Sequence, residues 1–276
     1  MTNILKKQWS DFLANDFALF RLINAVATEN HCAYYLVGAK ARDLLFEHFG
    51  CGRVQRATLD TDIAICCKNW QEFEKIKRAF LGSGHFTYDE KIMHRIYSDK
   101  YGMIDIIPFG EIEREGGKIT WPPEYDIEFS LVGFEDAYGC ALEIEIDDFT
   151  VRVTSPAGFV LLKLFAWMNR KNQKDASDFL SIISNYLDLG NQNRLFEDHL
   201  DLVNKDFDYI LSGCRLLGRD LNKFSLNTKD RLRVLFKDSS LMDQFTIAIS
   251  NVNRNYEEVL NMLDMIKQGF SDKVFK

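Results

Sequence analysis

Strand-like segments occur in the first 154 residues of this chain and give way to helical patterns after them, which restricts the fold more than any other feature. Short apolar runs at 33–37, 60–67, 91–98 and 103–108 are typical of strands, and 142–146 with 149–153 predict a hairpin. Helical spacing of apolar residues fills 11–28, 40–49 and 70–81, and 110–138 is expected to be irregular. The pattern predicts an α/β (α+β) domain with a small mixed sheet and flanking helices.

The second part of the chain begins with a typical helix start. Ser155 supplies a capping hydroxyl, and Pro156 follows at the first helical position. An apolar helix is predicted over 159–170, and further helices over 174–187, 195–216, 232–236 and 255–267. We therefore expect two domains, residues 1–154 and an all-helical domain of residues 155–276 that contributes to a nucleotide or acceptor cleft.

Charge and cysteine usage limit the classes of function. The net charge is −7, with −9 in residues 1–150 and +2 in residues 151–276, so general nucleic-acid binding is disfavoured. A local basic patch in residues 151–276 remains open, in one of three groups: Arg170, Lys171 and Lys174; Arg215, Arg219 and Lys223; or Lys229, Arg231, Arg233 and Lys237. The six cysteines do not have the spacing of a metal-binding motif. No apolar run approaches the length of about 18 residues that is needed to span a bilayer. We expect a cytoplasmic protein with reduced thiols and no membrane contact.

Two aspartates in the strand 60–67 are the first chemical signal. Asp60 and Asp62 are two residues apart, so their side chains share one face of the strand, while Ile63 and Ile65 bury the other. Two close carboxylates repel each other unless a cation lies between them. Mg²⁺ is commonly held by one or two carboxylates together with substrate phosphates.

A third aspartate, Asp105, stands alone among isoleucines in the strand 103–108. A carboxylate in an apolar strand is costly unless it faces solvent or a functional site. If this strand lies beside 60–67, the three carboxylates converge. Asp105 could then ligate metal and accept a proton from an attacking hydroxyl.

A glycine turn precedes these acids. The strand 33–37 runs into Gly38 and Ala39 and then into a helix that carries Lys40. Small residues let a phosphate approach the backbone, and the first N–H groups of a helix can bind an anion. The turn is a candidate phosphate site, with Lys40 adding positive charge.

The order of these elements resembles the nucleotidyltransferase superfamily typified by DNA polymerase beta, with its glycine turn, h-D-x-D-h and h-D-h. Residues 56–62 (Arg-Ala-Thr-Leu-Asp-Thr-Asp) resemble the R-x-T-x-D-x-D signature of the AbiEii-type abortive-infection toxins. Lys163, then Arg170 and a Lys-Asp-x-x-Asp segment ending at Asp178, is similar to that branch's C-terminal pattern. The resemblance extends over roughly residues 33–185. One departure is the Gly-Ala turn, where the family has Gly-Ser or Gly-Gly.

The resemblance implies transfer of a nucleoside monophosphate from a nucleoside triphosphate to an acceptor hydroxyl, with two Mg²⁺ ions on Asp60, Asp62 and Asp105. Lys163 lies in an apolar helix and could hold the triphosphate. Asp175 and Asp178 share a helix face, where they could receive the acceptor or pair with Lys163 or Arg170. The residues expected to be catalytic are Asp60, Asp62, Asp105, Lys163 and Asp178. Those expected to bind nucleotide are Gly38, Ala39, Lys40, Arg56, Thr58, Lys163 and Asp175.

Four readings of the function stay open. The toxin resemblance implies a tRNA acceptor and an antitoxin partner. Residues 36–45 also look like the G-G-x-V-R-D-x-L-L motif of CCA-adding enzymes, but the R-R-D-F segment of that family is missing. A small-molecule transferase acting on an aminoglycoside-like cation would suit the acidic charge. An inactive nucleotide-binding module is the fourth reading, and the presence of all three aspartates argues against it.

Overall fold

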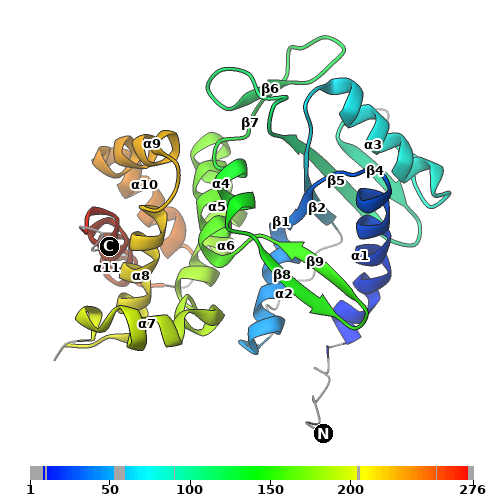
Figure 1. The fold of residues 1–276 in the computed structure, drawn as a ribbon. Coiled ribbons are helices and arrows are strands. Elements are labelled where there is room, and N and C mark those ends of the chain that lie inside the picture. Colours follow the sequence, from blue (N-terminus) through cyan, green and yellow to red (C-terminus); the bar gives the residue numbers. More distant parts are fainter. Residues whose placement is uncertain are drawn as a thin grey trace, which may run out of the picture. The chain divides into compact units, whose positions relative to one another are not determined.

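The computed structural model describes residues 9, 11–52, 60–89, 91–203, 206–252 and 254–272 (Figure 1). The chain divides into two compact units, Met1–Thr154 and Ser155–Lys276. The predicted fold class is confirmed, because a mixed sheet with helices occupies the first unit and helices make up the described part of the second. Among the described helices, none combines the length and the apolar character needed to cross a bilayer.

The first unit is built on a seven-stranded sheet with the order β3-β4-β5-β2-β1-β9-β8. Strand β2 pairs with β5 in parallel and with β1 in antiparallel orientation, and β1 pairs with β9 in parallel, so the sheet is mixed. The strands are β1 (Tyr34–Val37), β2 (Asp60–Cys66), β3 (Thr87–Tyr88), β4 (Arg95–Ser98), β5 (Gly102–Phe109), β8 (Leu142–Ile146) and β9 (Phe149–Val153).

The two central strands alternate between apolar and acidic positions, as the sequence pattern predicts. Ile63 in β2 and Ile104 and Ile106 in β5 are fully buried, whereas Asp62 and Asp105 on the opposite face are only partly buried. Three long helices complete the unit: α1 (Asp11–Glu29) packs against β9 and α3 (Trp70–Gly82), and α2 (Gly38–Phe49) packs against β1 and β2. The acidic face of β2 and β5 is therefore the candidate location of a functional site.

Two local predictions for the first unit are wrong. The strand expected from residue 91 begins only at Arg95, because the Asp89 carboxylate accepts hydrogen bonds from the backbone N–H groups of Lys91 and Ile92 and holds a turn. The stretch 110–138, expected to be irregular, contains the paired strands β6 (Lys118–Thr120) and β7 (Glu128–Ser130) and the short helix α4 (Phe134–Gly139).

Helices are the regular elements among the described residues of the second unit, and side-chain caps start its long helices. Ser155 caps the first of them by accepting a hydrogen bond from the Gly158 N–H, as the Ser-Pro signal predicts. Its core includes Phe159, Phe179, Leu217 and Phe245. The helices are α5 (Pro156–Arg170), α6 (Gln173–Ile183), α7 (Gln192–Asp198), α8 (Tyr209–Leu221), α9 (Leu226–Lys237), α10 (Ser239–Ser250) and α11 (Tyr256–Ser271).

The single helix predicted over 195–216 is wrong. The structure divides this region into α7, a 3₁₀ turn at Leu200–Leu202 and α8. Asp208 caps the N-terminus of α8, because its carboxylate accepts a hydrogen bond from the Leu211 N–H at 2.8 Å. The helix α10 was not foreseen, and Asp238 caps it in the same way through the Leu241 N–H.

Helices α8 and α11 approach each other closely through two glycines. A Cβ atom at Gly218 would lie 2.1 Å from the Ile266 carbonyl oxygen, and one at Gly269 would lie 1.9 Å from the Arg215 carbonyl oxygen. Backbone atoms cannot rotate away as side chains can, so neither position accepts a side chain without separating the helices.

We predict that Gly218→Ala lowers the free energy of unfolding by about 1–3 kcal/mol, because overpacking a tight contact outweighs the helix propensity of alanine. The matched control is Gly82→Ala at the end of α3, where a Cβ meets nothing within 4 Å. Chemical denaturation followed by circular dichroism measures both. Equal stability of the two variants would contradict the close contact.

Candidate active site

The sheet brings the three predicted aspartates onto adjacent strands. Asp62 of β2 is the register partner of Asp105 in β5, and Asp60 is the partner of Met103. Register partners project to the same face of a sheet, as do residues two apart on one strand. All three carboxylates therefore belong to one face, at the end of β2 where the strand begins.

A positively charged side chain from a third strand lies beside these carboxylates. Arg95 of β4 is the register partner of Asp105 on its other side. Its Nε donates to Asp105 Oδ1 at 2.7 Å and its Nη2 donates to Oδ2 at 2.8 Å, which is a bidentate pair. Hydrogen bonding to Asp105 raises the pKa of the Arg95 guanidinium, so Arg95 keeps its positive charge.

Sequence reasoning missed Arg95. The segment was predicted as a strand, and the charge alternates with the buried Ile96, which indicates that Arg95 lies on the polar face. Its contact with Asp105, however, depends on the antiparallel register of β4 and β5, which the sequence does not reveal.

The glycine turn is fitted to Asp62. Gly38 has a φ of +67°, a left-handed conformation, and it follows Val37, the register partner of Asp62. A Cβ at Gly38 would lie 2.0 Å from Asp62 Oδ2. The turn therefore requires glycine at position 38 for two reasons. The backbone has a left-handed φ, and the Asp62 carboxylate fills the space that a Cβ atom would need. Its predicted role in binding phosphate stays a prediction.

The other residues expected near the turn have other surroundings. Helix α2 starts at Gly38, so Ala39 lies in its first turn, and Val37 provides no side-chain cap for its N–H groups. Lys40 is buried, and its Nζ lies 2.5 Å from Asp16 Oδ2 of α1. Lys40 thus ties two helices together in this structure. Arg56 and Thr58 fall in 53–59, outside the described residues.

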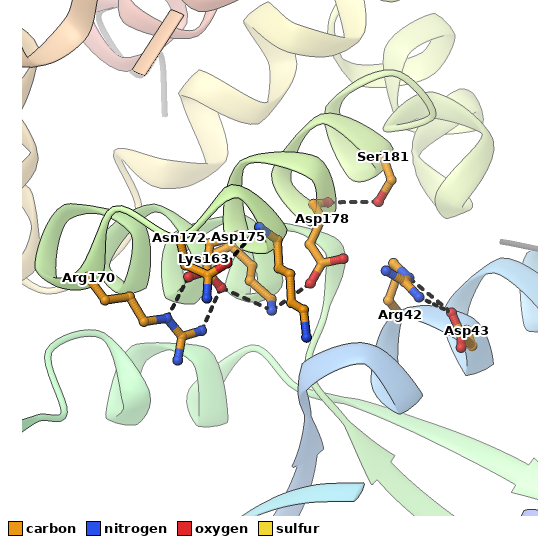
Figure 2. A network of polar contacts seen from close by, with 9 residues as sticks. Arg42, Asp43, Lys163, Arg170, Asn172, Asp175, Asp178 and Ser181 are labelled. Carbon is orange, nitrogen blue, oxygen red and sulfur yellow. Dashed lines mark hydrogen bonds and ion pairs between the residues drawn. The ribbon is translucent and has the colours of Figure 1, made fainter. Parts of the chain in front are cut away.

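In the second unit, the predicted lysine and aspartates form one network across α5 and α6 (Figure 2). Lys163 Nζ lies 2.6 Å from Asp178 Oδ2 and 3.3 Å from Asp175 Oδ1. Asp175 is fully buried and also accepts two hydrogen bonds from Arg170, at 2.6 and 2.7 Å. Of the alternatives left open, the structure shows the aspartates paired with Lys163 and Arg170.

One of the three candidate basic groups of the second unit, formed by Arg215, Arg219 and Lys223, is neutralised by neighbouring acids. Arg215 and Arg219 both bind Asp272, and Arg219 also binds Asp201. Lys223 lies 2.8 Å from Asp220 Oδ1. These cations are held in ion pairs within the unit, so they offer little free positive charge to a nucleic-acid backbone.

The carboxylates meet the requirements of a divalent cation only in part. Among the residues that the structure describes, no group of three or more His, Cys, Asp or Glu side chains is arranged to hold a metal. Asp60 and Asp62 suit Mg²⁺ that is completed by phosphate oxygens. Asp105 does not fit such a site as it stands, because both of its oxygens accept hydrogen bonds from Arg95.

The chain is distantly similar to several solved structures. No family model and no curated protein sequence matches it. An antigenic nucleotidyltransferase-like protein from Paracoccidioides brasiliensis has 18% identity and a TM-score of 0.43, covering 71% of this chain and 92% of its own. The antibiotic-resistance factor ANT(2'')-Ia has 16% identity and a TM-score of 0.38, with coverages of 68% and 96%. The Thermotoga maritima CCA-adding enzyme complexed with tRNA has 14% identity and a TM-score of 0.27, with coverages of 95% and 70%. With values this low, function has to be argued from the residues.

We predict that Gly38→Ala destabilises the chain more than Gly50→Ala does. Both glycines have left-handed backbones, so each substitution costs about 1–2 kcal/mol of strain. A Cβ at Gly50 meets nothing within 4 Å, whereas one at Gly38 displaces the Asp62 carboxylate and adds about 1–3 kcal/mol. Urea denaturation measures the difference, and equal losses would show that Asp62 does not pack on the turn.

Proposed function

We propose that this chain transfers a nucleoside monophosphate from a nucleoside triphosphate to an acceptor hydroxyl. The observation that carries the proposal is the meeting of three features on neighbouring strands of one sheet: the glycine turn after β1, Asp60 and Asp62 in β2, and Asp105 in β5. The sequence motifs predict this set, and the pairing of Asp62 with Asp105 and with Val37 supports it. Three acidic side chains on one face repel each other, and a bound divalent cation would offset that repulsion.

Asp60 and Asp62 would hold a divalent cation, and Asp105 would join them when released from Arg95. Bound Mg²⁺ supplies positive charge that stabilises the negative charge on the transferring phosphoryl group and the leaving pyrophosphate. Gly38 and Ala39 keep the backbone at the turn accessible, so that phosphate oxygens can approach the N–H groups at the start of α2.

The transfer itself exchanges one phosphorus–oxygen bond for another. The acceptor oxygen forms a bond to the α-phosphorus, and the bond from that phosphorus to the oxygen bridging the β-phosphate breaks. Pyrophosphate leaves with the electron pair of that bond. Asp105 is our candidate for the base that takes the hydroxyl proton, which requires one of its oxygens to be free.

Lys163 is proposed to bind the phosphates of the nucleotide. A lysine offers three donors, and two of its contacts are now to Asp178 and Asp175. Asp175 also holds Arg170, so it stays paired if Lys163 exchanges a carboxylate for a phosphate. Asp178, which would lose its contact with Lys163 in that exchange, is the proposed contact for the acceptor.

The acceptor we propose is the 3′ hydroxyl of tRNA, with the chain acting as an AbiEii-like toxin that an antitoxin protein restrains. This follows from the R-x-T-x-D-x-D resemblance of residues 56–62. A small cationic acceptor is the second candidate. The acidic charge of residues 1–150 and the paired state of Arg215, Arg219 and Lys223 favour that alternative.

We predict that the purified protein moves label from an α-labelled nucleoside triphosphate to an acceptor in the presence of Mg²⁺. Asp62→Asn should lower the rate by at least about 100-fold, because electrostatic stabilisation at phosphoryl groups is usually the largest catalytic contribution. The matched control is Asp126→Asn, an exposed carboxylate of the same unit, which should leave the rate unchanged.

Each acceptor gives a distinct result in this assay. Label that enters bulk tRNA supports the toxin-like activity, and label that enters only an added aminoglycoside supports the small-molecule alternative. Nucleotide binding without transfer to either would indicate an inactive binding module. An Asp62→Asn variant as active as the parent would overturn the proposed chemistry.

A further inference from the structure

A cavity in the first unit lies apart from the acidic face of β2 and β5. Its volume is about 420 Å³, which is in the range of cavities that hold small organic ligands. Residues of α1, α4, β8 and β9 line it, and it reaches Tyr34 at the start of β1. Asp62 pairs with Val37 at the other end of β1. An extended chain rises about 3.3 Å per residue, so the two ends of the strand are roughly 10 Å apart.

Arg152 gives this cavity a positive charge that is held in one position. Its Nη1 donates to the Tyr138 hydroxyl at 2.6 Å, and its guanidinium carbon lies 4.5 Å from the centre of the Tyr138 ring. Tyr138 in turn packs against the rings of Tyr35 and Phe109. Because the guanidinium is already positioned, a ligand that binds it loses less conformational entropy.

Within the described parts of the chain, no carboxylate lies within hydrogen-bond distance of Arg152. Arg95 and Arg170 each donate from Nε and Nη2 to one aspartate, which is the usual fork for a carboxylate. In Arg152 the Nε is buried without a hydrogen-bond partner, and the Nη2 lies 4.0 Å from Glu143 Oε1. Glu143 is the register partner of Arg152, but 69% of its side chain is exposed. The fork of Arg152 therefore lacks the oxyanion that it fits.

Several other polar groups of the cavity are neutral, so they do not repel an anion. Asn24 and Thr28 of α1 and Thr150 of β9 offer amide and hydroxyl groups. Burial raises the pKa of the Cys32 thiol to about 12, so this residue is uncharged near neutral pH. Glu143 carries the opposite charge to Arg152, and its carboxylate weakens the attraction of the cavity for an anion.

We propose that this cavity binds a small polar ligand through an oxyanion group, which is a carboxylate or a phosphate. The Nε and Nη2 groups of Arg152 bind two of its oxygens, as those of Arg95 bind Asp105. The Tyr138 hydroxyl accepts from Arg152 and so has its own proton to donate to the ligand. Thr150 and its neutral neighbours suit hydroxyl groups on the rest of the ligand. The cavity is separate from the proposed transfer site, so this inference is independent of the proposed function.

Isothermal titration calorimetry of the full chain tests the proposal with inorganic phosphate, citrate and, as a neutral control, glucose. We expect at least one of the two anions to bind the parent. Arg152→Gln should weaken that binding at least about tenfold, because hydrogen bonds between charged groups are lost. Glu143→Gln should strengthen it about two- to fivefold, because a nearby negative charge is removed. Arg78→Gln, at an exposed arginine of α3, is the matched control and should bind as the parent does.

The pattern of binding identifies the oxyanion. Phosphate binding that depends on Arg152 supports a phosphate-bearing ligand, and citrate binding that depends on it supports a carboxylate. Anion binding that Arg152→Gln leaves unchanged overturns the proposal, as does a parent that binds neither anion or binds glucose equally well. Circular dichroism shows whether Arg152→Gln is folded. If it is not, Arg152→Lys carries the test, since it keeps the charge without the fork and should still weaken binding.

Discussion

The placement of β2 between an antiparallel neighbour and a parallel one is the constraint on which the candidate site depends. Pairing with β1 brings the glycine turn against Asp62, and pairing with β5 sets Asp105 beside the same residue. Neither contact follows from closeness in the sequence. The buried isoleucines on the far face of β2 and β5 fix this register, because a slip of one residue would move the acids into the core. The stability of the sheet and the geometry of the acids therefore have the same origin.

Electrostatics explains why positive groups lie among these acids. Carboxylates on adjacent strands repel each other and resist ionisation unless cations offset their charge. In the first unit, Arg95 offsets Asp105. In the second unit, Lys163 and Arg170 offset Asp175, which is fully buried. Asp105 and Asp175 are thus already paired, and a substrate or metal ion has to compete for them.

The sequence was sufficient to predict the elements and side-chain orientations that depend on neighbouring residues in the chain. Apolar runs predicted β1, β2 and β5, the spacing of Asp60 and Asp62 predicted their shared face, and Ser155 predicted the start of α5. It failed where the structure depends on pairing between distant segments. The partnership of Arg95 with Asp105 needs the β4–β5 register. Apolar spacing also missed two local caps: Asp208 divides the region predicted as one helix over 195–216, and Asp238 starts α10, which was not predicted.

The central claim is that the acidic face of β2 and β5 holds a divalent cation together with a nucleotide. Its most direct measurement is anomalous diffraction from crystals grown with Mn²⁺ and a non-hydrolysable nucleoside triphosphate. We expect an anomalous peak within ligand distance of Asp60 and Asp62. A nucleotide bound elsewhere, or Mn²⁺ peaks that avoid both aspartates, would contradict it.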